Sequence, residues 1–507
     1  MPAELDALLD QASALLRRRD AAGALALLTQ AAARHDEHAD CHAMLGVAYR
    51  MNEQWDEAET AYRRAIALSP THARAHNNLA DVLRVRGDYS GALDAVQASL
   101  KIDSANLDAL RNLAAIQHAL RYYAAAAAAA REAQRLAPQD HRLHLTLARI
   151  EHDAANYREA SAAYLAFLAK EPDHVDALTD LGLIYIHRNM DEMALESFKK
   201  ALSLAPDHTP AQFGLAQARA NLTPPWHIPM MNEPKRNLAY RDAIRQAVKP
   251  GDLVLEIGSG AGLLAMLAAE AGAERVVSCE MVKEVADEAR AIVAQNGFAD
   301  RVSIVSAHSR DLKVGEHLPR RADVLVSEIL ADDFVGEGVL PSLTDAIDRL
   351  ITPEARIVPA RGAAMAALVG GEHMAYLLDL DKACGFDVRS FAKFKPWRQA
   401  VPGRIAYEAY SDEFALLEYN FNDVSSLQPV DKKCDVRIVA PGRCYGVLQW
   451  LRLELAPGVI YENHPRDTVS VWNKTLYSFP EPLDVMPGDT VSIRVWQHED
   501  YLFVTKA

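Results

Sequence analysis

Residues 252–280 read DLVLEIGSGAGLLAMLAAEAGAERVVSCE and decide the fold of the second half of the chain. A short apolar run leads through Gly258, Gly260 and Gly262 into the helical pattern LLAMLAAEAG, and a second apolar run, RVVSCE, follows. This order of strand, glycine loop, helix and strand predicts a nucleotide-binding βαβ unit. In such a unit the glycines allow a tight turn and bring backbone N–H groups close to the ligand.

Two acidic residues narrow the class of cofactor. Glu256 stands two positions before the first glycine, and Glu280 ends the second apolar run, 22 residues after Gly258. A carboxylate at the tip of the second strand is placed to accept both hydroxyls of an adenosine ribose, and a carboxylate beside the glycine loop can meet an ammonium group. The pair therefore favours S-adenosylmethionine, which has a cationic amino-acid tail and a sulfonium, over NAD as the alternative.

Two further strands follow this unit. RVSIVSAHSRDL, residues 301–312, predicts a strand and a polar turn that reaches the adenine edge through Ser309 or Asp311, although ordinary turn capping would explain the same residues. ADVLVSEIL, residues 322–330, predicts a fourth strand. It places Glu328 and Glu337, nine residues apart, at the carboxyl end of a central strand, where open α/β sheets bind ligands.

At this point a family resemblance becomes specific. The pattern SEIL-x5-GEG resembles the double-glutamate loop of the protein arginine N-methyltransferase family, and VLEIGSGAGLLAMLAAEAGAERVVSCEM is similar to its cofactor motif. WHIPMMNEPKRNLAYRDAI, residues 226–244, resembles the branch that contains protein arginine methyltransferases 7 and 9, some of which also carry tetratricopeptide repeats. The resemblance covers residues 225–507 and is strongest from 225 to 345.

The resemblance implies a role for each matching residue. Glu328 and Glu337 would clamp an arginine, because two carboxylates can bind the planar fork of a guanidinium and leave one nitrogen aimed at the methyl group. His227, Met230 and Arg236 would lie on an opening helix over the cofactor, with Met230 near the sulfonium methyl and Arg236 on the methionine carboxylate. Asp332 and Asp333, between the two glutamates, are expected to be solvated.

From about residue 360 the sequence alternates between apolar and polar residues in short runs separated by turns, which predicts a β-barrel. In the family this barrel forms the other wall of the arginine cleft. Trp472 corresponds to the tryptophan of the family's T-H-W loop and is expected to contact the acceptor side chain. Val471 replaces the histidine of that loop, and Glu233 stands where many members have aspartate, so a proton relay through that pair is in doubt.

The first two-fifths of the chain repeats with a period of 34 residues. A small residue follows leucine once per period, at Gly46, Ala80, Ala114, Ala148 and Gly182, and proline or serine recurs 24 residues later. The pattern resembles the tetratricopeptide repeat and covers about residues 3–210. It implies a helical superhelix whose concave face holds a peptide or protein partner, with a spacer or a dimerisation surface as the alternative.

Composition bounds the remaining possibilities. A net charge of −15 opposes binding to nucleic acid or anionic lipid, so neither a nucleic-acid nor a membrane partner is expected. The five cysteines show no spacing typical of a metal site, and we expect them to be reduced. With no export signal and no apolar run of membrane-spanning length, the expected location is cytoplasmic.

These patterns predict a multidomain chain: a tetratricopeptide superhelix at 1–220, a Rossmann-like α/β methyltransferase domain at 221–360 and a β-barrel at 361–507. The two prolines of NLTPPW, residues 221–226, mark the first boundary. The predicted function is S-adenosylmethionine-dependent methylation of arginine in a protein substrate. Three questions stay open: whether the acceptor is something other than arginine, whether the chain is an inactive scaffold, and whether it forms a homodimer, because residues 373–399 show no clear dimerisation arm.

Overall fold

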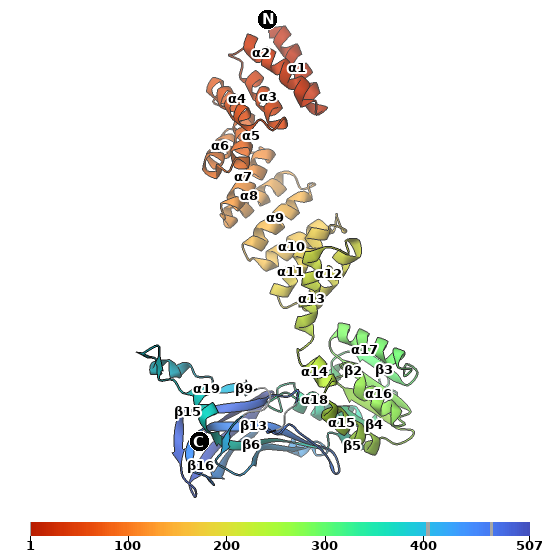
Figure 1. Cartoon of the computed structure of the whole chain (residues 1–507). Helices are drawn as coiled ribbons and strands as arrows, with labels where there is room; N and C mark the ends of the chain where they lie inside the picture. Colours follow the sequence, from red (N-terminus) through yellow and green to blue (C-terminus); the bar gives the residue numbers. More distant parts are fainter. Residues whose placement is uncertain (1, 402–405, 467–469) are drawn as a thin grey trace. The chain divides into compact units, whose positions relative to one another are not determined.

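The computed structural model describes residues 2–401, 406–466 and 470–507. The chain separates into two compact units, Met1–Asn221 and Leu222–Ala507 (Figure 1). The first unit is entirely helical, and the second contains all of the described β-strands.

The first unit is a succession of helices in which each packs against the next from α1 to α12, and Gly214 of α13 lies against Phe198 of α12. Aromatic residues explain why a small residue recurs in the first helix of a pair: a Cβ added at Gly46 would lie 2.6 Å from the ring of Tyr62, and one at Gly182 would lie 2.6 Å from Phe198. The helices are α1 Pro2–Arg17, α2 Ala21–Arg34, α3 Ala39–Met51, α4 Trp55–Leu68, α5 Ala73–Val85, α6 Tyr89–Ile102, α7 Leu107–Ala119, α8 Tyr123–Leu136, α9 Arg142–Asp153, α10 Tyr157–Leu168, α11 Val175–His187, α12 Asp191–Leu204 and α13 Thr209–Leu222.

The second unit begins with a five-stranded parallel sheet in the order β3-β2-β1-β4-β5. The strand order reverses between β1 and β4, which is the position where open α/β sheets bind ligands. The strands are β1 Leu253–Ile257, β2 Arg275–Glu280, β3 Val302–Ser306, β4 Ala322–Ser327 and β5 Ile351–Val358. The associated helices are α14 His227–Met231, α15 Pro234–Ala247, α16 Leu263–Glu270, α17 Lys283–Gln295, the 3-10 turn η1 Ser309–Asp311 and α18 Val339–Arg349.

After β5 the strands become antiparallel. A seven-stranded sheet contains β6 Arg361–Gly370, β9 Arg398–Val401, β10 Glu408–Ala409, β11 Phe414–Asn420, β13 Gly442–Ala456, β14 Val459–Glu462 and β15 Lys474–Val485. A three-stranded sheet contains β12 Val430–Arg437, β16 Thr490–His498 and β17 Tyr501–Lys506. The expected barrel region therefore consists of two antiparallel sheets, joined by a β-bridge between Ser411 and Ile438.

Smaller elements decorate this antiparallel region. They are α19 Glu372–Leu378, the strand pair β7 Lys382–Ala383 and β8 Phe386–Asp387, and the 3-10 turns η2 Arg389–Phe394 and η3 Val424–Ser426. Among the described residues, no helix combines the length and the apolar character that crossing a membrane requires.

The parallel and antiparallel parts of the second unit share one hydrophobic core. Buried Leu255 of the parallel sheet belongs to the same cluster as Leu453 and Ile493 of the two antiparallel sheets. Only Pro359 and Ala360 separate β5 from β6, and α15 packs on β5, β13 and β14. This shared core brings loops from both parts to the same end of the parallel sheet.

Candidate functional site

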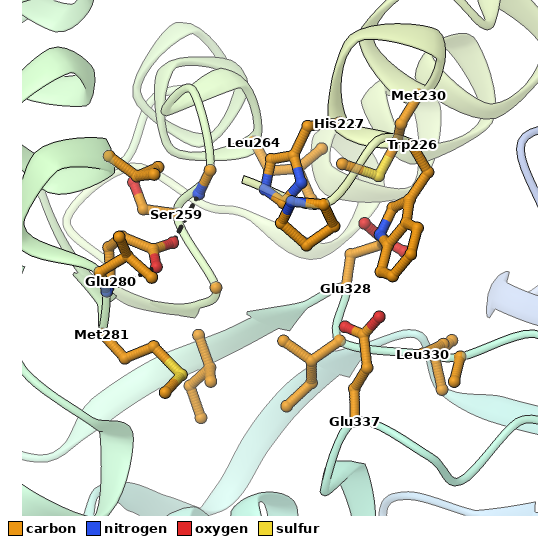
Figure 2. Close-up of a pocket in the computed structure, with 18 of the residues that line it drawn as sticks. Trp226, His227, Met230, Ser259, Leu264, Glu280, Met281, Glu328, Leu330 and Glu337 are labelled. Atoms are coloured by element: carbon orange, nitrogen blue, oxygen red, sulfur yellow. Dashed lines mark hydrogen bonds between the residues drawn. The ribbon is translucent and has the colours of Figure 1, made fainter. Parts of the chain in front are cut away.

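A cavity of about 630 Å³ lies at the carboxyl end of the parallel sheet. Its walls come from the ends of β1, β2 and β4, from the segment around α14, and from the antiparallel region through Arg398 and residues 471–473. Figure 2 shows Glu280 at one end of this cavity, Glu328 and Glu337 at the other, and His227 between them. Four of the predicted acids, Glu256, Glu280, Glu328 and Glu337, therefore line one cavity.

The glycine loop takes a conformation that side chains disfavour. Gly258 and Gly260 have φ values of 86° and 50°, in the left-handed region that favours glycine. A Cβ at Gly258 would lie 2.7 Å from the side chain of Ile329, which packs the loop against the residue that follows Glu328. Gly262 also has a positive φ and precedes α16, but it does not line the cavity.

Glu256 is buried on the cavity wall at 1% exposure. Ser278 donates a hydrogen bond to one carboxylate oxygen, and the other oxygen, Oε1, has no hydrogen-bond partner among the described residues. Burial raises the pKa of Glu256 to about 8, although the Ser278 hydrogen bond acts in the opposite direction. An ammonium group at this point would give Oε1 a charged donor.

Glu280 projects from the end of β2 and is held by backbone. Its carboxylate accepts hydrogen bonds from the N–H of Gly260 at 3.1 Å and from that of Val282 at 3.0 Å. The first of these bonds is drawn in Figure 2. The glycine loop and the acid at the tip of the second strand thus fix each other's position.

The opening segment covers the cavity with α14. His227 and Met230 of α14 both line it. Burial lowers the pKa of His227, which favours the neutral imidazole, while the charge of Glu280 acts in the opposite direction. His227 Nδ1 has no hydrogen-bond partner among the described residues.

Arg236, on α15, connects the cofactor side of the cavity to the glutamate side. It is 3% exposed, and its Nη2 donates to Glu328 Oε2 at 2.6 Å. Its guanidinium also lies over the rings of Tyr240 and Trp472. Arg236 Nε is unpartnered among the described residues, so part of its donor set stays available to an anionic group in the cavity.

Glu328 and Glu337 stand in different environments. Burial raises the pKa of Glu328, and the adjacent Arg236 opposes that shift. Glu337 is open to the cavity, yet the surrounding walls withdraw its carboxyl from bulk water. This desolvation, followed by repulsion from Glu328, Asp332 and Asp333, raises the pKa of Glu337 to about 7. The two acids are thus one carboxylate paired with Arg236 and one with no ion pair among the described residues.

Asp332 and Asp333 are both anchored by side chains or backbone of the antiparallel region, so the expectation that they are merely solvated was wrong. Asn473 donates to both oxygens of Asp332, through its backbone N–H at 2.7 Å and its Nδ2 at 2.8 Å. Asp333 is 1% exposed, and Arg398 Nη2 lies 2.9 Å from its Oδ2. The partners reach these acids from the antiparallel region, which is why a local sequence pattern did not reveal them.

The Val471–Trp472 segment closes the glutamate end. Trp472 is 5% exposed, lines the cavity and donates its indole N–H to Leu330 O at 2.7 Å. The backbone N–H of Val471 donates to Glu233 Oε2 at 2.8 Å, and the Tyr461 hydroxyl donates to the other oxygen of Glu233. The carboxylate of Glu233 therefore has two donors without the family histidine.

Of the two residues expected at the adenine edge, only Ser309 lines the cavity. Ser309 lines the cavity with a buried hydroxyl that has no partner among the described residues, whereas Asp311 is exposed and does not line it. Sequence reasoning missed several lining residues: Trp226, Met281, Arg398 and Asn473. Met281 could have been found, since it directly follows Glu280 at a strand tip, but Arg398 and Asn473 carry no local signal.

The cavity wall fits a polar cofactor. Five of the residues that line the cavity carry a buried polar atom without a partner among the described residues: His227 Nδ1, Arg236 Nε, Glu256 Oε1, Ser259 Oγ and Ser309 Oγ. Burying such atoms costs free energy unless a ligand or a water molecule forms hydrogen bonds with them. Their mixture of a cation, a carboxyl and hydroxyls matches the carboxylate, ammonium and nucleoside of S-adenosylmethionine.

Comparison with protein-family models gives different matches for the helical first unit and for the second unit. The tetratricopeptide repeat model matches residues 9–73, 44–107, 77–141 and 145–209. A model described as ribosomal protein L11 methyltransferase matches residues 241–360, which include the parallel sheet. The first unit is therefore built of tetratricopeptide repeats, and the second contains a methyltransferase domain.

Three relatives show how far the sequence similarity extends along the chain. An arginine N(omega)-methyltransferase of Streptomyces achromogenes subsp. streptozoticus is 32% identical over 281 residues, which cover 55% of this chain and 77% of the relative. Protein arginine N-methyltransferase 9 of Mus musculus is 26% identical over 65% of this chain and 43% of its own length. Protein arginine N-methyltransferase 7 of Oryza sativa subsp. indica is 32% identical over 47% of this chain and 36% of its own length. The chain thus spans most of the bacterial relative but less than half of these two eukaryotic ones.

Proposed function

Because the chain belongs to the arginine N-methyltransferase family, we propose that it transfers a methyl group from S-adenosylmethionine to a guanidinium nitrogen of arginine in a protein substrate. The observation that carries this proposal is the shared cavity: Glu328 and Glu337 stand at one end and the glycine loop and Glu280 at the other. One continuous cavity is what direct transfer between a nucleoside cofactor and a cationic acceptor requires.

The cofactor would be held by residues of the glycine loop and the opening segment. Glu280 would accept the ribose hydroxyls, Glu256 would receive the ammonium and Arg236 the carboxylate, with Met230 beside the sulfonium and Ser309 at the adenine edge. When bound, S-adenosylmethionine supplies an electrophilic methyl group. Arg236 supports this arrangement because it already contacts Glu328, so one side chain would orient both the cofactor and the acceptor acid.

The acceptor guanidinium would bind between Glu328 and Glu337. Both carboxylates accept its N–H groups and hold its positive charge away from the nitrogen that attacks the methyl group. The carboxylate of Glu328 is held in its orientation by the hydrogen bond from Arg236. Glu337 is the acid whose pKa lies near 7, so it can hold the proton that the guanidinium loses after transfer.

The departure at Val471 does not favour an inactive scaffold. Each carboxylate oxygen of Glu233 accepts a hydrogen bond, one from the Tyr461 hydroxyl and one from the Val471 N–H. Glu233 therefore supports the Trp472 segment without a histidine. Both acceptor glutamates are also present, so the inactive scaffold is the weaker alternative.

The repeats support a protein acceptor. A row of helical hairpins presents a concave face suited to a peptide or protein partner, which would bring an arginine-containing chain to the cavity. The names of the relatives differ in the kind of acceptor: the bacterial one is named for arginine and the eukaryotic ones for protein arginine. Free arginine is therefore the acceptor to test beside protein.

The antiparallel region supports a homodimer. Residues 372–397 expose several aromatic side chains, including Tyr376 at 83% and Phe386 at 75% exposure. Large exposed apolar side chains gathered on one segment are typical of an interaction surface. Sedimentation over a range of protein concentrations tests this, and a concentration-independent monomer mass would contradict it.

The activity test uses labelled cofactor with an arginine-rich protein and, separately, with free arginine. Acid hydrolysis of the labelled product should release methylated arginine from the protein sample. Glu328→Gln and Glu337→Gln should each lower the rate by about a hundredfold or more. The exposed Glu418 on β11 supplies the control variant, Glu418→Gln, which should retain the wild-type rate.

Three results would overturn the proposal: no cofactor-dependent label, label on a residue other than arginine, or label from either glutamate variant that equals that from the wild-type chain. Because Glu328→Gln leaves the buried Arg236 without its ion pair, its melting temperature must accompany its rate. Glu337 has no such partner, so its variant reports on activity alone.

A further inference from the structure

The loop between the two acceptor glutamates is fastened to the antiparallel region. Trp472 donates to Leu330 O at 2.7 Å, Asn473 donates twice to Asp332, and Arg398 pairs with Asp333 at 2.9 Å. These three links fall within four consecutive residues, 330–333.

A fourth residue of the loop is held by packing. Phe334 is fully buried, with its ring stacked 5.6 Å from Tyr419 and 6.1 Å from Phe421. Its φ of 81° is one that bulky side chains rarely adopt. A strained backbone of this kind persists only where the surrounding structure determines it. The antiparallel region therefore imposes the conformation of this loop.

The position of Glu337 depends on that conformation. No described residue donates a hydrogen bond to the Glu337 carboxylate, so the side chain is placed by the backbone that carries it. Glu328, by contrast, is fixed directly by Arg236. Any change in the backbone conformation of residues 330–336 would therefore change the distance between the carboxylates of Glu328 and Glu337.

We propose that Asn473 and Arg398 are positioning residues for the acceptor, because through Asp332 and Asp333 they set where Glu337 lies relative to Glu328. This inference rests on the proposed function of the two glutamates. It assigns a role in acceptor orientation to four residues that do not themselves need to touch the guanidinium. The predicted signature is a loss of acceptor turnover with no loss of cofactor binding.

The Asp332–Asn473 link gives the sharpest test, because two variants separate geometry from charge. Asp332→Ala removes both acceptors and should lower kcat/KM for the acceptor by about tenfold, since small misplacements of reacting groups are costly. Asp332→Asn removes the charge but keeps an oxygen for the backbone N–H, and the Asn473 amide can turn to accept from the new amide. This conservative variant should retain at least half of the wild-type kcat/KM.

The Asp333–Arg398 link needs a double variant. Arg398→Ala alone would leave a buried carboxylate unpaired, so it is combined with Asp333→Asn, which can still accept from the Gly336 N–H. The pair should lower kcat/KM for the acceptor by about tenfold. Asp431→Asn, which breaks an exposed ion pair with Arg494 between β12 and β16, is the matched control and should be silent.

Each variant is measured with the full chain for acceptor kinetics, cofactor affinity by calorimetry and melting temperature. The inference is overturned if Asp332→Ala keeps wild-type kinetics, if its cofactor affinity falls as much as its turnover, or if Asp332→Asn is as impaired as Asp332→Ala. The last result would mean that the charge of Asp332 matters and not its hydrogen bonds. A wild-type chain that does not methylate arginine would instead remove the proposed function, so the two failures are distinguishable.

Discussion

The glycine loop at residues 258–262 and the glutamate loop at residues 328–338 line the same cavity, and both contain backbone at positive φ. In the first loop glycine occupies the left-handed positions, so the conformation costs little and follows from the local sequence. In the second, Phe334 occupies such a position, and ring stacking together with links from Asn473 and Arg398 keep it there. One loop is shaped by its own residues and the other by a distant part of the chain.

The two loops should therefore be sensitive to different substitutions. The glycine loop should fail when a side chain is added within it. The glutamate loop should fail when the surface that holds it is altered, even at residues far from the cavity. Variants of the two kinds distinguish these modes, and their expected effects differ widely in size.

The largest effect is expected for Gly258→Ala. The added Cβ would lie 2.7 Å from Ile329 and would force an alanine to a φ of 86°. We expect the dissociation constant for S-adenosylmethionine to rise by about a hundredfold, measured by calorimetry. Gly251→Ala is the control, because Gly251 has a similar φ, 87°, with no atom within 4 Å of its added Cβ. Equal loss in both variants would mean that backbone strain, and not contact with Ile329, is responsible.

Gly362→Ala should damage the glutamate loop from outside. Its Cβ would lie 2.5 Å from the Phe334 ring, which cannot move freely because it is stacked on Tyr419. We expect acceptor kcat/KM to fall about tenfold and the free energy of unfolding to fall by about 1–3 kcal/mol. Cofactor affinity should not change. Gly458→Ala, in the open turn between β13 and β14, should leave turnover intact, and a loss of cofactor affinity in Gly362→Ala would contradict the separation of the two loops.

The pH dependence should report on Glu337. Its pKa is raised to about 7 by desolvation and by Glu328, Asp332 and Asp333, so the carboxyl is mostly protonated at pH 6 and mostly ionised at pH 8. Because only the ionised form binds a guanidinium well, acceptor kcat/KM should rise about tenfold over this range. Glu337→Gln should lose this inflection along with most of its rate. A flat profile in the wild-type protein would show that Glu337 is already ionised at pH 6.

The smallest effect is expected for Val471→His. Glu233 already accepts one hydrogen bond on each carboxylate oxygen, from Tyr461 and from the Val471 backbone, so an added imidazole would only supplement donors that are already present. We expect the methylation rate to change by less than about threefold, the range of a weakly coupled pair of side chains. An increase of more than about tenfold would show that the family histidine limits the rate of this chain.

The sequence predicted the parts that are encoded locally. The 34-residue period predicted the helical repeats, the alternation of strands and helices predicted the parallel sheet, and the spacing of Glu256, Gly258 and Glu280 brought those residues to one cavity. It failed for Asp332 and Asp333, whose partners Asn473 and Arg398 lie far along the chain in another part of the fold. The local sequence around an acidic residue does not show whether its carboxylate is solvated or hydrogen-bonded. That depends on which distant part of the chain packs against it.

The core shared by the parallel and antiparallel sheets also determines which part of the chain can be exchanged between relatives as a unit. A chimaera that took its parallel sheet from one relative and its antiparallel region from another would separate Asp332 from Asn473, Asp333 from Arg398 and Phe334 from its ring partners. Such a chimaera would keep every residue of the cofactor motif and still misplace an acceptor acid. Residues 222–507 should therefore be exchanged between relatives as one block, with the repeats as the module that can vary freely.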